Sequence, residues 1–307
     1  MAEIWSQEYW AQKGRVKLYM FRKRLGPPAP GKAPYPVLFL VHGSSFGSRA
    51  GFDLTVGGQD YSMMNWFARL GFDVWGLDHE GYSRSTRTES NSDIASGVED
   101  LQAGAAVVER ETGLQKYMYY GQSSGALRAA AFAEAYPELV ERVVLDAFVW
   151  TGKDAPTLIK RRDNLDFFRT HNRRPVDRAF FHSIFNRDRP GLSDPAVPDA
   201  LAEAELALGD TVPTGTYLDM CANLPVVNPR KLHCPVLIIR GEHDGIATEE
   251  DLLEFFMLLP HKDKQFVFLP GQAHIGPLGT NRHRFFHVIQ AFISMPLRRD
   301  AESSGCH

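Results

Sequence analysis

The chain has 307 residues, of which 34 are lysine or arginine and 37 are aspartate or glutamate, giving a formal net charge of -3. This length accommodates one large domain or a core with an inserted segment. The near balance of charge argues against a strongly basic surface, so we expect neither nucleic acid nor an anionic membrane as a partner. Hydrophobic residues make up 44% and charged residues 23% of the chain, the composition of a folded globular protein.

The three cysteines, Cys221, Cys234 and Cys306, are widely spaced and match no metal-ligand or redox motif. A disulfide framework is therefore not expected. The first residues lack the basic start and apolar run of a signal peptide, and no stretch approaches the roughly 20 apolar residues of a membrane span. We therefore expect a cytoplasmic protein with no membrane partner, and the sequence leaves open whether it forms homo-oligomers.

Apolar runs of strand length alternate with segments of helical periodicity, which is typical of a mostly parallel sheet with helices on both faces. In the first half, Ser92 is a candidate N-cap of a long helix and Gly113 its C-terminal stop. The predicted strands are residues 16–21, 36–41, 72–77, 116–120 and 142–147, and the predicted helices are residues 61–70, 93–112 and 124–135. This order predicts a doubly wound α/β fold.

The alternation is interrupted at residues 150–227, where aromatic, proline and charged residues replace buried strands. It resumes with a strand at 235–240, a helix near 249–259 and a strand at 265–269. We interpret the interruption as a helical insertion, and the tail at 297–307 as a frayed polar end. The first part of the insertion is basic, with Lys160, Arg161, Arg162, Arg169, Arg173, Arg174 and Arg178, and its second part is acidic. A solvated surface is the simpler interpretation of this charge, and an anion-binding patch is the alternative.

The clearest chemical motif is a G-x-S-x-G sequence at residues 121–125, which lies between an apolar strand and an alanine-rich helix. A serine at a sharp strand-to-helix turn exposes its hydroxyl, and small residues beside it avoid collisions with the neighbouring backbone. The turn also directs the positive end of the helix dipole at the reaction centre. We therefore predict Ser123 as a nucleophile and the N–H of Ser124 as an oxyanion donor.

The same pattern occurs at residues 43–47, around Ser45, but no helical periodicity follows it. This loop is better suited to supply a second backbone N–H to the oxyanion. Ser44 is the first candidate for that donor and Ser45 the alternative, because the sequence does not fix which amide points inward.

A serine nucleophile requires a base, normally a histidine, which is itself oriented by a carboxylate. His274 follows directly after the strand predicted at 265–269, in a loop flanked by glycines. Asp244 follows the strand at 235–240 and precedes Gly245, although an aspartate before glycine is also a common turn residue. Since the carboxyl ends of parallel strands meet at one edge of the sheet, we expect Ser123, Asp244 and His274 to converge there.

Over about residues 15–295 the sequence resembles the α/β-hydrolase fold family, and five motifs carry the resemblance. They are Leu-Val-His42-Gly43, Asp78 to Ser85, Gly121 to Gly125, Gly241 to Asp244 and Gly271 to His274. The resemblance implies an eight-stranded sheet, a helical cap at 150–227 inserted into a core of residues 1–149 and 228–307, and a Ser123, Asp244, His274 triad. Ser83 and Ser124 depart from the residues that many members carry at these positions.

The segment at 150–227 carries pairs of phenylalanines, which either pack the cap on the core or line the site. The candidate substrate-binding residues are Ser45, Phe167, Phe168 and Phe181. Phenylalanines in the site would favour an apolar acyl or aryl group. The run from Asp78 to Glu80 lacks the spacing of a metal site, and no phosphate loop or dinucleotide motif occurs, so we expect neither metal nor cofactor.

These observations predict an esterase-like serine hydrolase that needs no cofactor. The expected substrate is a carboxylic ester of a small or medium apolar molecule, cleaved through an acyl-enzyme. The same triad also suits carbon–carbon bond, lactone, amide or thioester hydrolysis. A non-catalytic ligand-binding protein of the same fold is the alternative from another class, because the fold alone does not fix the function.

Overall fold

The computed structural model describes residues 3–296 and contains one eight-stranded sheet with the strand order β1-β2-β6-β3-β7-β8-β11-β12. The first two strands pair antiparallel with each other, and β2 pairs antiparallel with β6. All remaining pairs are parallel. The strands are β1 (Ile4–Lys13), β2 (Val16–Leu25), β3 (Val37–Val41), β6 (Asp73–Leu77), β7 (Tyr117–Gln122), β8 (Val140–Asp146), β11 (Val236–Gly241) and β12 (Lys264–Leu269).

Each strand predicted from the sequence overlaps an observed one, so the predicted doubly wound α/β sheet is confirmed. Within this sheet, the strand that was not predicted is β1, which forms the edge and leaves most of its side chains partly or fully exposed. Its polar residues give no buried run of the kind that identified the central strands. The short strands outside the sheet, β4 (Thr55–Val56), β5 (Gln59–Asp60), β9 (Arg173–Pro175) and β10 (Thr211–Pro213), were not predicted either.

Helices cover both faces of the sheet, and side chains alternate between the two cores along each strand. Val37, Phe39 and Val41 of β3 belong to the core beneath α3, α4 and α10, whereas Leu38 and Leu40 belong to the core beneath α2 and α11. The helices are α2 (Met63–Arg69), α3 (Ile94–Thr112), α4 (Ser124–Ala135), α10 (Glu249–Leu258) and α11 (Arg282–Ile293). The final helix, α11, was not predicted.

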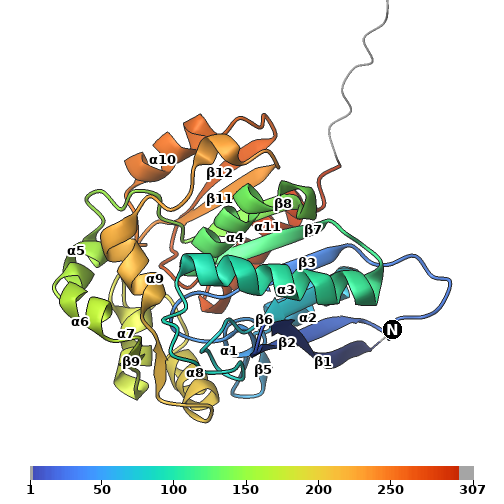
Figure 1. The fold of residues 1–307 in the computed structure, drawn as a ribbon, viewed down its shortest axis with the longest axis horizontal. Helices are drawn as coiled ribbons and strands as arrows, with labels where there is room; N and C mark the ends of the chain where they lie inside the picture. Colours follow the sequence, from blue (N-terminus) through green and yellow to red (C-terminus); the bar gives the residue numbers. More distant parts are fainter. Residues whose placement is uncertain (1–2, 297–307) are drawn as a thin grey trace, which may run out of the picture.

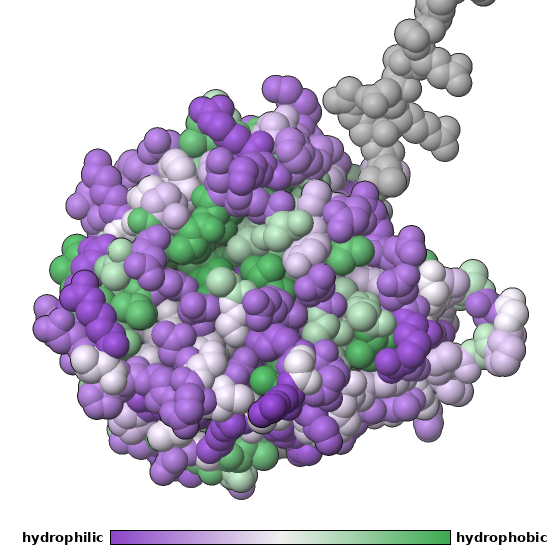
Figure 2. Space-filling view, in the orientation of Figure 1, coloured by the Kyte–Doolittle hydropathy of each residue, from purple (hydrophilic) through white to green (hydrophobic). Residues whose placement is uncertain are grey.

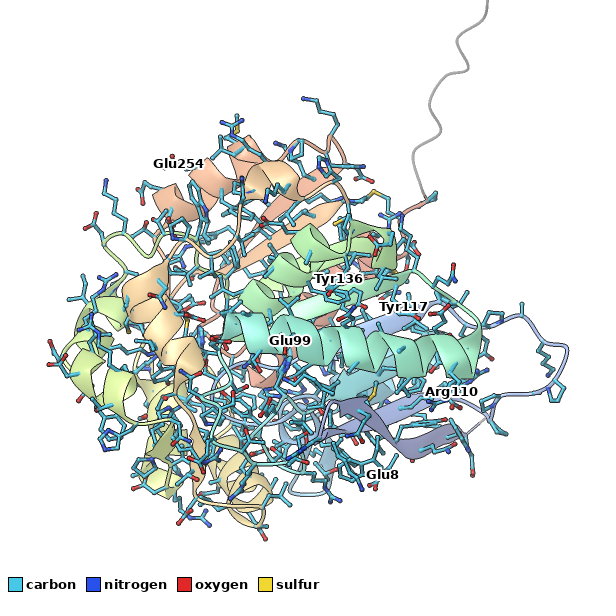
Figure 3. The ribbon with its side chains drawn as sticks, in the orientation of Figure 1. Glu8, Glu99, Arg110, Tyr117, Tyr136 and Glu254 are labelled. Atoms are coloured by element: carbon cyan, nitrogen blue, oxygen red, sulfur yellow. The ribbon has the colours of Figure 1, made fainter. Side chains whose placement is uncertain are left out.

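Helix α3 shows how local sequence sets the ends of an element. Its N-cap is Asp93, whose carboxylate accepts a hydrogen bond of 2.8 Å from the N–H of Ser96, and not Ser92 as predicted. Gly113 ends the helix in the left-handed conformation, as expected. Charged side chains such as Glu99 and Arg110 lie on its outer side (Figure 3). Among residues 3–296, no helix has the length and apolar character needed to cross a membrane.

The segment between β8 and β11 (residues 147–235) contains the insertion predicted at 150–227, and it gathers at one end of the sheet (Figure 1). Short helices make up most of it, together with the antiparallel pair of β9 and β10, which are separated in the chain by α7 and α8. Its elements are α5 (Pro156–Arg162), α6 (Leu165–Thr170), β9 (Arg173–Pro175), α7 (Arg178–Asn186), α8 (Ala196–Leu206), β10 (Thr211–Pro213) and α9 (Gly215–Leu218), followed by a short π-helix (Asp219–Asn223) and a 3-10 helix (Pro229–Lys231). A short helix, α1 (Ser48–Phe52), and the pair β4 (Thr55–Val56) and β5 (Gln59–Asp60) lie after β3.

The surface in view is mostly hydrophilic, with apolar side chains gathered in a hollow beside α4 (Figure 2). A hollow of about 640 Å³ between α3, α4 and the end of the insertion is lined by Ile94, Val98, Ala131 and Val226, among others. A larger one, of about 760 Å³, lies at the amino ends of β8 and β11, around Val140 and Pro235. Ligands of open α/β sheets bind at the carboxyl ends of the strands, so the size of these hollows does not identify the site.

Candidate active site

Ser123 lies at the turn between β7 and α4, with φ 57° and ψ -124°, a backbone conformation that residues other than glycine rarely adopt. The glycines on either side are required by close backbone contacts. A Cβ atom at Gly121 would lie 2.4 Å from the carbonyl oxygen of Gly125. One at Gly125 would lie 2.2 Å from the carbonyl oxygen of Val41. The strained turn is held by its neighbours and directs the hydroxyl beyond the edge of the sheet.

The carboxyl ends of three strands bring Ser123, Asp244 and His274 together. His274 Nε2 lies 3.1 Å from Ser123 Oγ, and His274 Nδ1 lies 2.9 Å from Asp244 Oδ1. All three residues are buried, with 8%, 3% and 5% of their surfaces exposed, respectively. A base within hydrogen-bond distance of a hydroxyl, and oriented by a carboxylate, is the arrangement needed to activate a serine.

The buried carboxyl groups of Asp244 and Asp146 have opposite pKa shifts. Burial raises the pKa of Asp244, but the His274 imidazole outweighs it and Arg187 adds to the effect, so the net pKa lies below its ordinary value. Asp146, at the end of β8, has its pKa raised well above the ordinary value by burial, even though the hydroxyl of Tyr120 lies 2.8 Å away. The negative charge of Asp244 adds to that increase. Asp244 is therefore the carboxylate that can stabilise an imidazolium at His274.

The loop after β3 lies against the Ser123 turn. A Cβ atom at Gly43 would lie 3.2 Å from that of Ser123, and both Ser44 and Ser45 line the cavity that contains the Ser123 side chain. A chain of hydroxyls fixes the loop, since Thr216 of α9 donates to Ser44 Oγ at 2.8 Å and Ser44 donates to Ser124 Oγ at 2.7 Å. The Ser45 hydroxyl accepts a hydrogen bond of 3.2 Å from Arg174, and no histidine within residues 3–296 bonds to it.

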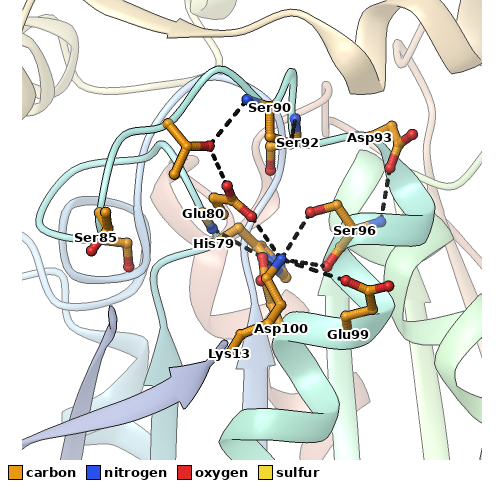
Figure 4. Close-up of polar contacts among 12 residues, drawn as sticks. Lys13, His79, Glu80, Ser85, Ser90, Ser92, Asp93, Ser96, Glu99 and Asp100 are labelled. Atoms are coloured by element: carbon orange, nitrogen blue, oxygen red, sulfur yellow. Dashed lines mark hydrogen bonds and ion pairs between the residues drawn. The ribbon is translucent and has the colours of Figure 1, made fainter. Parts of the chain in front are cut away.

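A buried polar network extends from the loop after β3 to strand β1, and Figure 4 shows its part around Lys13, His79, Glu80 and Asp100. His42 Nδ1 lies 2.8 Å from the Gly43 carbonyl, and His42 Nε2 accepts the N–H of His79 at 3.0 Å. His79 in turn contacts Asp100, which pairs with Lys13 of β1 at 2.5 Å. Burial lowers the pKa of both histidines well below the ordinary value, and nearby positive charge adds to it, so both rings are neutral. Within the described part of the chain, no group of three metal-ligating side chains forms, here or elsewhere.

A family model described as serine aminopeptidase, S33, matches residues 51–275. The chain belongs to this family of α/β hydrolases. A search of curated proteins found no match to the sequence.

Solved structures similar to this S33-family hydrolase share its fold at low sequence identity. A carboxylesterase from Bacillus subtilis has a TM-score of 0.67 and 18% identity, covering 94% of this chain and 92% of its own. E-2-(acetamidomethylene)succinate hydrolase has a TM-score of 0.67 and 19% identity, covering 94% and 100%. 2-Hydroxy-6-oxo-6-phenylhexa-2,4-dienoate hydrolase from Rhodococcus has a TM-score of 0.68 and 17% identity, covering 96% and 100%. These likenesses establish the fold of the family member and leave its substrate open.

The cavity at Ser123 is small, about 20 Å³, and is closed in part by the insertion. Its walls are Gly43, Ser44, Ser45, Phe46, Gln122, Ser123, Arg161, Ile184, Arg187, His274 and Ile275. The predicted substrate-binding residues Phe167, Phe168 and Phe181 do not line it. Phe168 packs on Tyr217 at a ring distance of 5.4 Å. Phe181 is fully buried in a hydrophobic cluster that joins α7 and α8 to residues of the segment after β3, such as Phe46 and Leu54.

Three arginines near Ser123 were not predicted as site residues. Arg161 and Arg187 belong to this wall, and Arg174 lies beside it, against Ser44 and Ser45. The basic run at the start of the insertion was interpreted as a solvated surface, which holds for exposed residues such as Lys160 and Arg178. It is wrong for Arg174, which is 6% exposed, and for Arg161, which reaches the cavity wall. The run itself was the available signal, because several arginines so close in sequence are also compatible with an anion-binding patch.

Proposed function

We propose that this protein is a cofactor-independent serine hydrolase that cleaves a carboxylic ester through an acyl-enzyme. The observation that carries the proposal is the continuous hydrogen-bonded line from Ser123 Oγ through His274 to Asp244, with distances of 3.1 Å and 2.9 Å. The proposal includes a small-molecule substrate, a cytoplasmic location, and a cap formed by residues 150–227 on a core of residues 1–149 and 228–307.

Ser123 Oγ attacks the ester carbonyl while His274 Nε2 accepts the hydroxyl proton. Asp244 accepts a hydrogen bond from His274 Nδ1 and stabilises the imidazolium that forms. The imidazolium then gives its proton to the leaving alkoxide, which leaves the acyl group on Ser123. A water molecule, deprotonated by His274, attacks the acyl-enzyme, and the acid leaves as Ser123 recovers its proton.

Backbone amides stabilise the negative charge on the carbonyl oxygen of the tetrahedral intermediate. The N–H of Ser124 begins helix α4 and adds the positive end of its dipole. The N–H of Ser44 is our choice for the second donor, supported by the hydroxyl contacts that fix this loop, and the N–H of Ser45 is the alternative. Losing one donor of this kind typically lowers kcat by about 10²–10³.

An ester is the first choice of substrate because the small cavity is walled partly by Phe46, Ile184 and Ile275, which suit a short apolar acyl chain. The proposed triad is equally compatible with lactone, thioester, amide and carbon–carbon bond hydrolysis. The family name adds weight to the amide alternative. A panel containing one member of each class, with product analysis by mass spectrometry, distinguishes these reactions.

The proposed nucleophile is tested with a neutral fluorophosphonate, which labels only an activated serine. We expect one label per protein, located by peptide mapping on Ser123 and absent in Ser123→Ala and His274→Ala. Ser45→Ala serves as the matched control and should still be labelled on Ser123. A folded wild-type protein that takes no label, or takes it on Ser45, would overturn the proposed function and favour a ligand-binding protein.

A further inference from the structure

Three arginines from separate elements of the insertion surround one buried tyrosine. Arg161 belongs to α5, Arg174 belongs to β9, and Arg187 directly follows α7. The guanidinium carbons of Arg161 and Arg174 lie 4.1 Å and 4.2 Å from the centroid of the Tyr217 ring, on α9. We call Arg161, Arg174, Arg187 and Tyr217 the arginine cluster.

The cluster has more positive charge than its surroundings neutralise. Among residues 3–296, neither Arg161 nor Arg174 has a carboxylate within ion-pair distance, whereas Arg187 pairs with Asp188 at 3.2 Å. Arg161 Nη1 and Arg174 Nε are buried and have no hydrogen-bond partner in the described part of the chain. Buried charges without counterions are costly, so an unpaired cluster of this kind requires an explanation.

The tyrosine offsets only part of this charge. Burial opposes ionisation of Tyr217, but the charges of Arg161, Arg174 and Arg187 outweigh it and lower the pKa to about 7. Burial, together with Arg187 and Arg174, lowers the pKa of Arg161 to about 10, although Tyr217 opposes this shift. Arg161 therefore remains protonated at neutral pH. Even a fully ionised Tyr217 together with Asp188 leaves a net positive charge.

This charge faces the reaction centre. Arg161 and Arg187 line the same cavity as Ser123 and His274. Arg174 donates to the carbonyl oxygen of Ser44 and to Ser45 Oγ, both at 3.2 Å, and so contacts the loop that carries the proposed oxyanion donors. A substrate whose carbonyl lies at Ser123 would therefore place the remainder of its acyl group near the guanidinium groups.

We propose that the arginine cluster binds a free carboxylate on the substrate, so that the ester cleaved at Ser123 is the monoester of a dicarboxylic acid. The proposal rests on the proposed function and specifies its substrate. A guanidinium presents parallel N–H donors that match the two oxygens of a carboxylate, and such charge-assisted bonds are strong in a site shielded from water. The apolar walls of the cavity would contact the methylene chain that joins the two carboxyl groups.

The test compares each mono-4-nitrophenyl ester of glutaric and adipic acid with the same compound carrying a methyl ester in place of its free carboxylate. We expect kcat/KM of the wild type to favour the free acid by at least about 10-fold, the scale of a charged hydrogen bond. Rates without enzyme and with Ser123→Ala are subtracted, because a free carboxylate can accelerate its own ester's hydrolysis.

Substitutions then assign this preference to the cluster. Arg161→Met should reduce the ratio of the two kcat/KM values by about 10- to 100-fold, and Arg161→Lys should retain part of it. Lys160→Met is the matched control, since Lys160 is the exposed neighbour on the same helix and loses the same charge. Its ratio should equal that of the wild type. Equal ratios in the wild type, Arg161→Met and Lys160→Met would overturn the proposal.

A binding measurement separates this inference from the proposed function. Adipate titrated into the wild type by calorimetry should bind, and its affinity should fall in Arg161→Met but not in Lys160→Met. Fluorophosphonate labelling of Ser123 without adipate binding or acid preference would leave the hydrolase standing and remove the carboxylate site. Adipate binding without labelling of Ser123 would support the carboxylate site and contradict the proposed hydrolase. Circular dichroism establishes whether each variant is folded. If Arg161→Met is unfolded, Arg161→Lys takes its place in the comparison.

Discussion

Glu205 is expected to make the stability of this protein fall as the pH rises through neutrality. It lies on α8 of the insertion, is 5% exposed, and accepts hydrogen bonds of 3.0 Å from the N–H of Gly47 and from Ser83 Oγ. Burial is the main cause that raises its pKa to about 7, and the nearby Asp78 adds to it. The hydrogen bonds from Gly47 and Ser83 and the charge of Arg87 oppose this increase without cancelling it.

The sign and size of the effect follow from proton binding. The carboxyl titrates near pH 7 in the folded protein and near its ordinary pKa of 4.5 in the unfolded chain. Between these values the folded state binds more protons, so the free energy of unfolding decreases as the pH rises. Each pH unit in this window costs about 1.4 kcal/mol, so the contribution of Glu205 is about 3 kcal/mol less favourable at pH 8 than at pH 4.

Glu205→Gln removes this titration and keeps an oxygen that accepts hydrogen bonds. We expect the variant to be close to the wild type in stability at pH 5 and more stable by up to about 3 kcal/mol at pH 8. Urea unfolding at several pH values, followed by circular dichroism, measures the difference. Glu203→Gln, an exposed neighbour on α8, is the matched control and should show a pH-independent difference. A pH-independent difference for Glu205→Gln as well would refute the assigned titration.

Three further substitutions test the geometry of the candidate active site. Asp244→Asn removes the carboxylate that accepts the His274 Nδ1 proton, and kcat on a responsive ester should fall by about 10⁴ in steady-state assays. Gly121→Ala places a Cβ atom 2.4 Å from backbone that begins α4, so urea titration should give a free energy of unfolding lower by about 1–3 kcal/mol. Thr216→Val removes the hydroxyl that donates to Ser44 and fixes the proposed oxyanion loop, so we expect kcat to decrease by about 10-fold; an unchanged kcat would contradict this role.

The parts of the fold that were predicted from the sequence are those whose signal is local. Buried strands such as β3 and β11 are continuous apolar runs, and the helix at Ser124–Ala135 is delimited by the serine turn before it. Strand β1 has no such run because it is an edge strand that places exposed polar residues next to buried ones. Its position depends on pairing with β2, which is a property of the assembled sheet.

The residues of the site divide in the same way. Ser123, Asp244 and His274 each follow a recognisable strand, so the rule that strand ends converge was enough to place them together. Arg161 and Arg187 lie on the insertion, whose path over the core is set by tertiary packing. Nothing in the local sequence distinguishes Arg161 from its exposed neighbours Lys160 and Arg162. The phenylalanines predicted for the site do not line the cavity, again because the path of the insertion depends on tertiary packing.

Ser83 connects the core of the molecule with the insertion. It adopts a positive φ of 39°, a backbone conformation that favours glycine over residues with side chains. In this chain its hydroxyl donates to Glu205, and a Cβ atom at Gly47 would lie only 2.1 Å from Ser83 Oγ. The backbone strain, of order 1 kcal/mol, is thus offset by a contact that joins the turn after β6 to α8. This departure from the family pattern therefore acts as a structural link between the turn after β6 and helix α8 of the insertion.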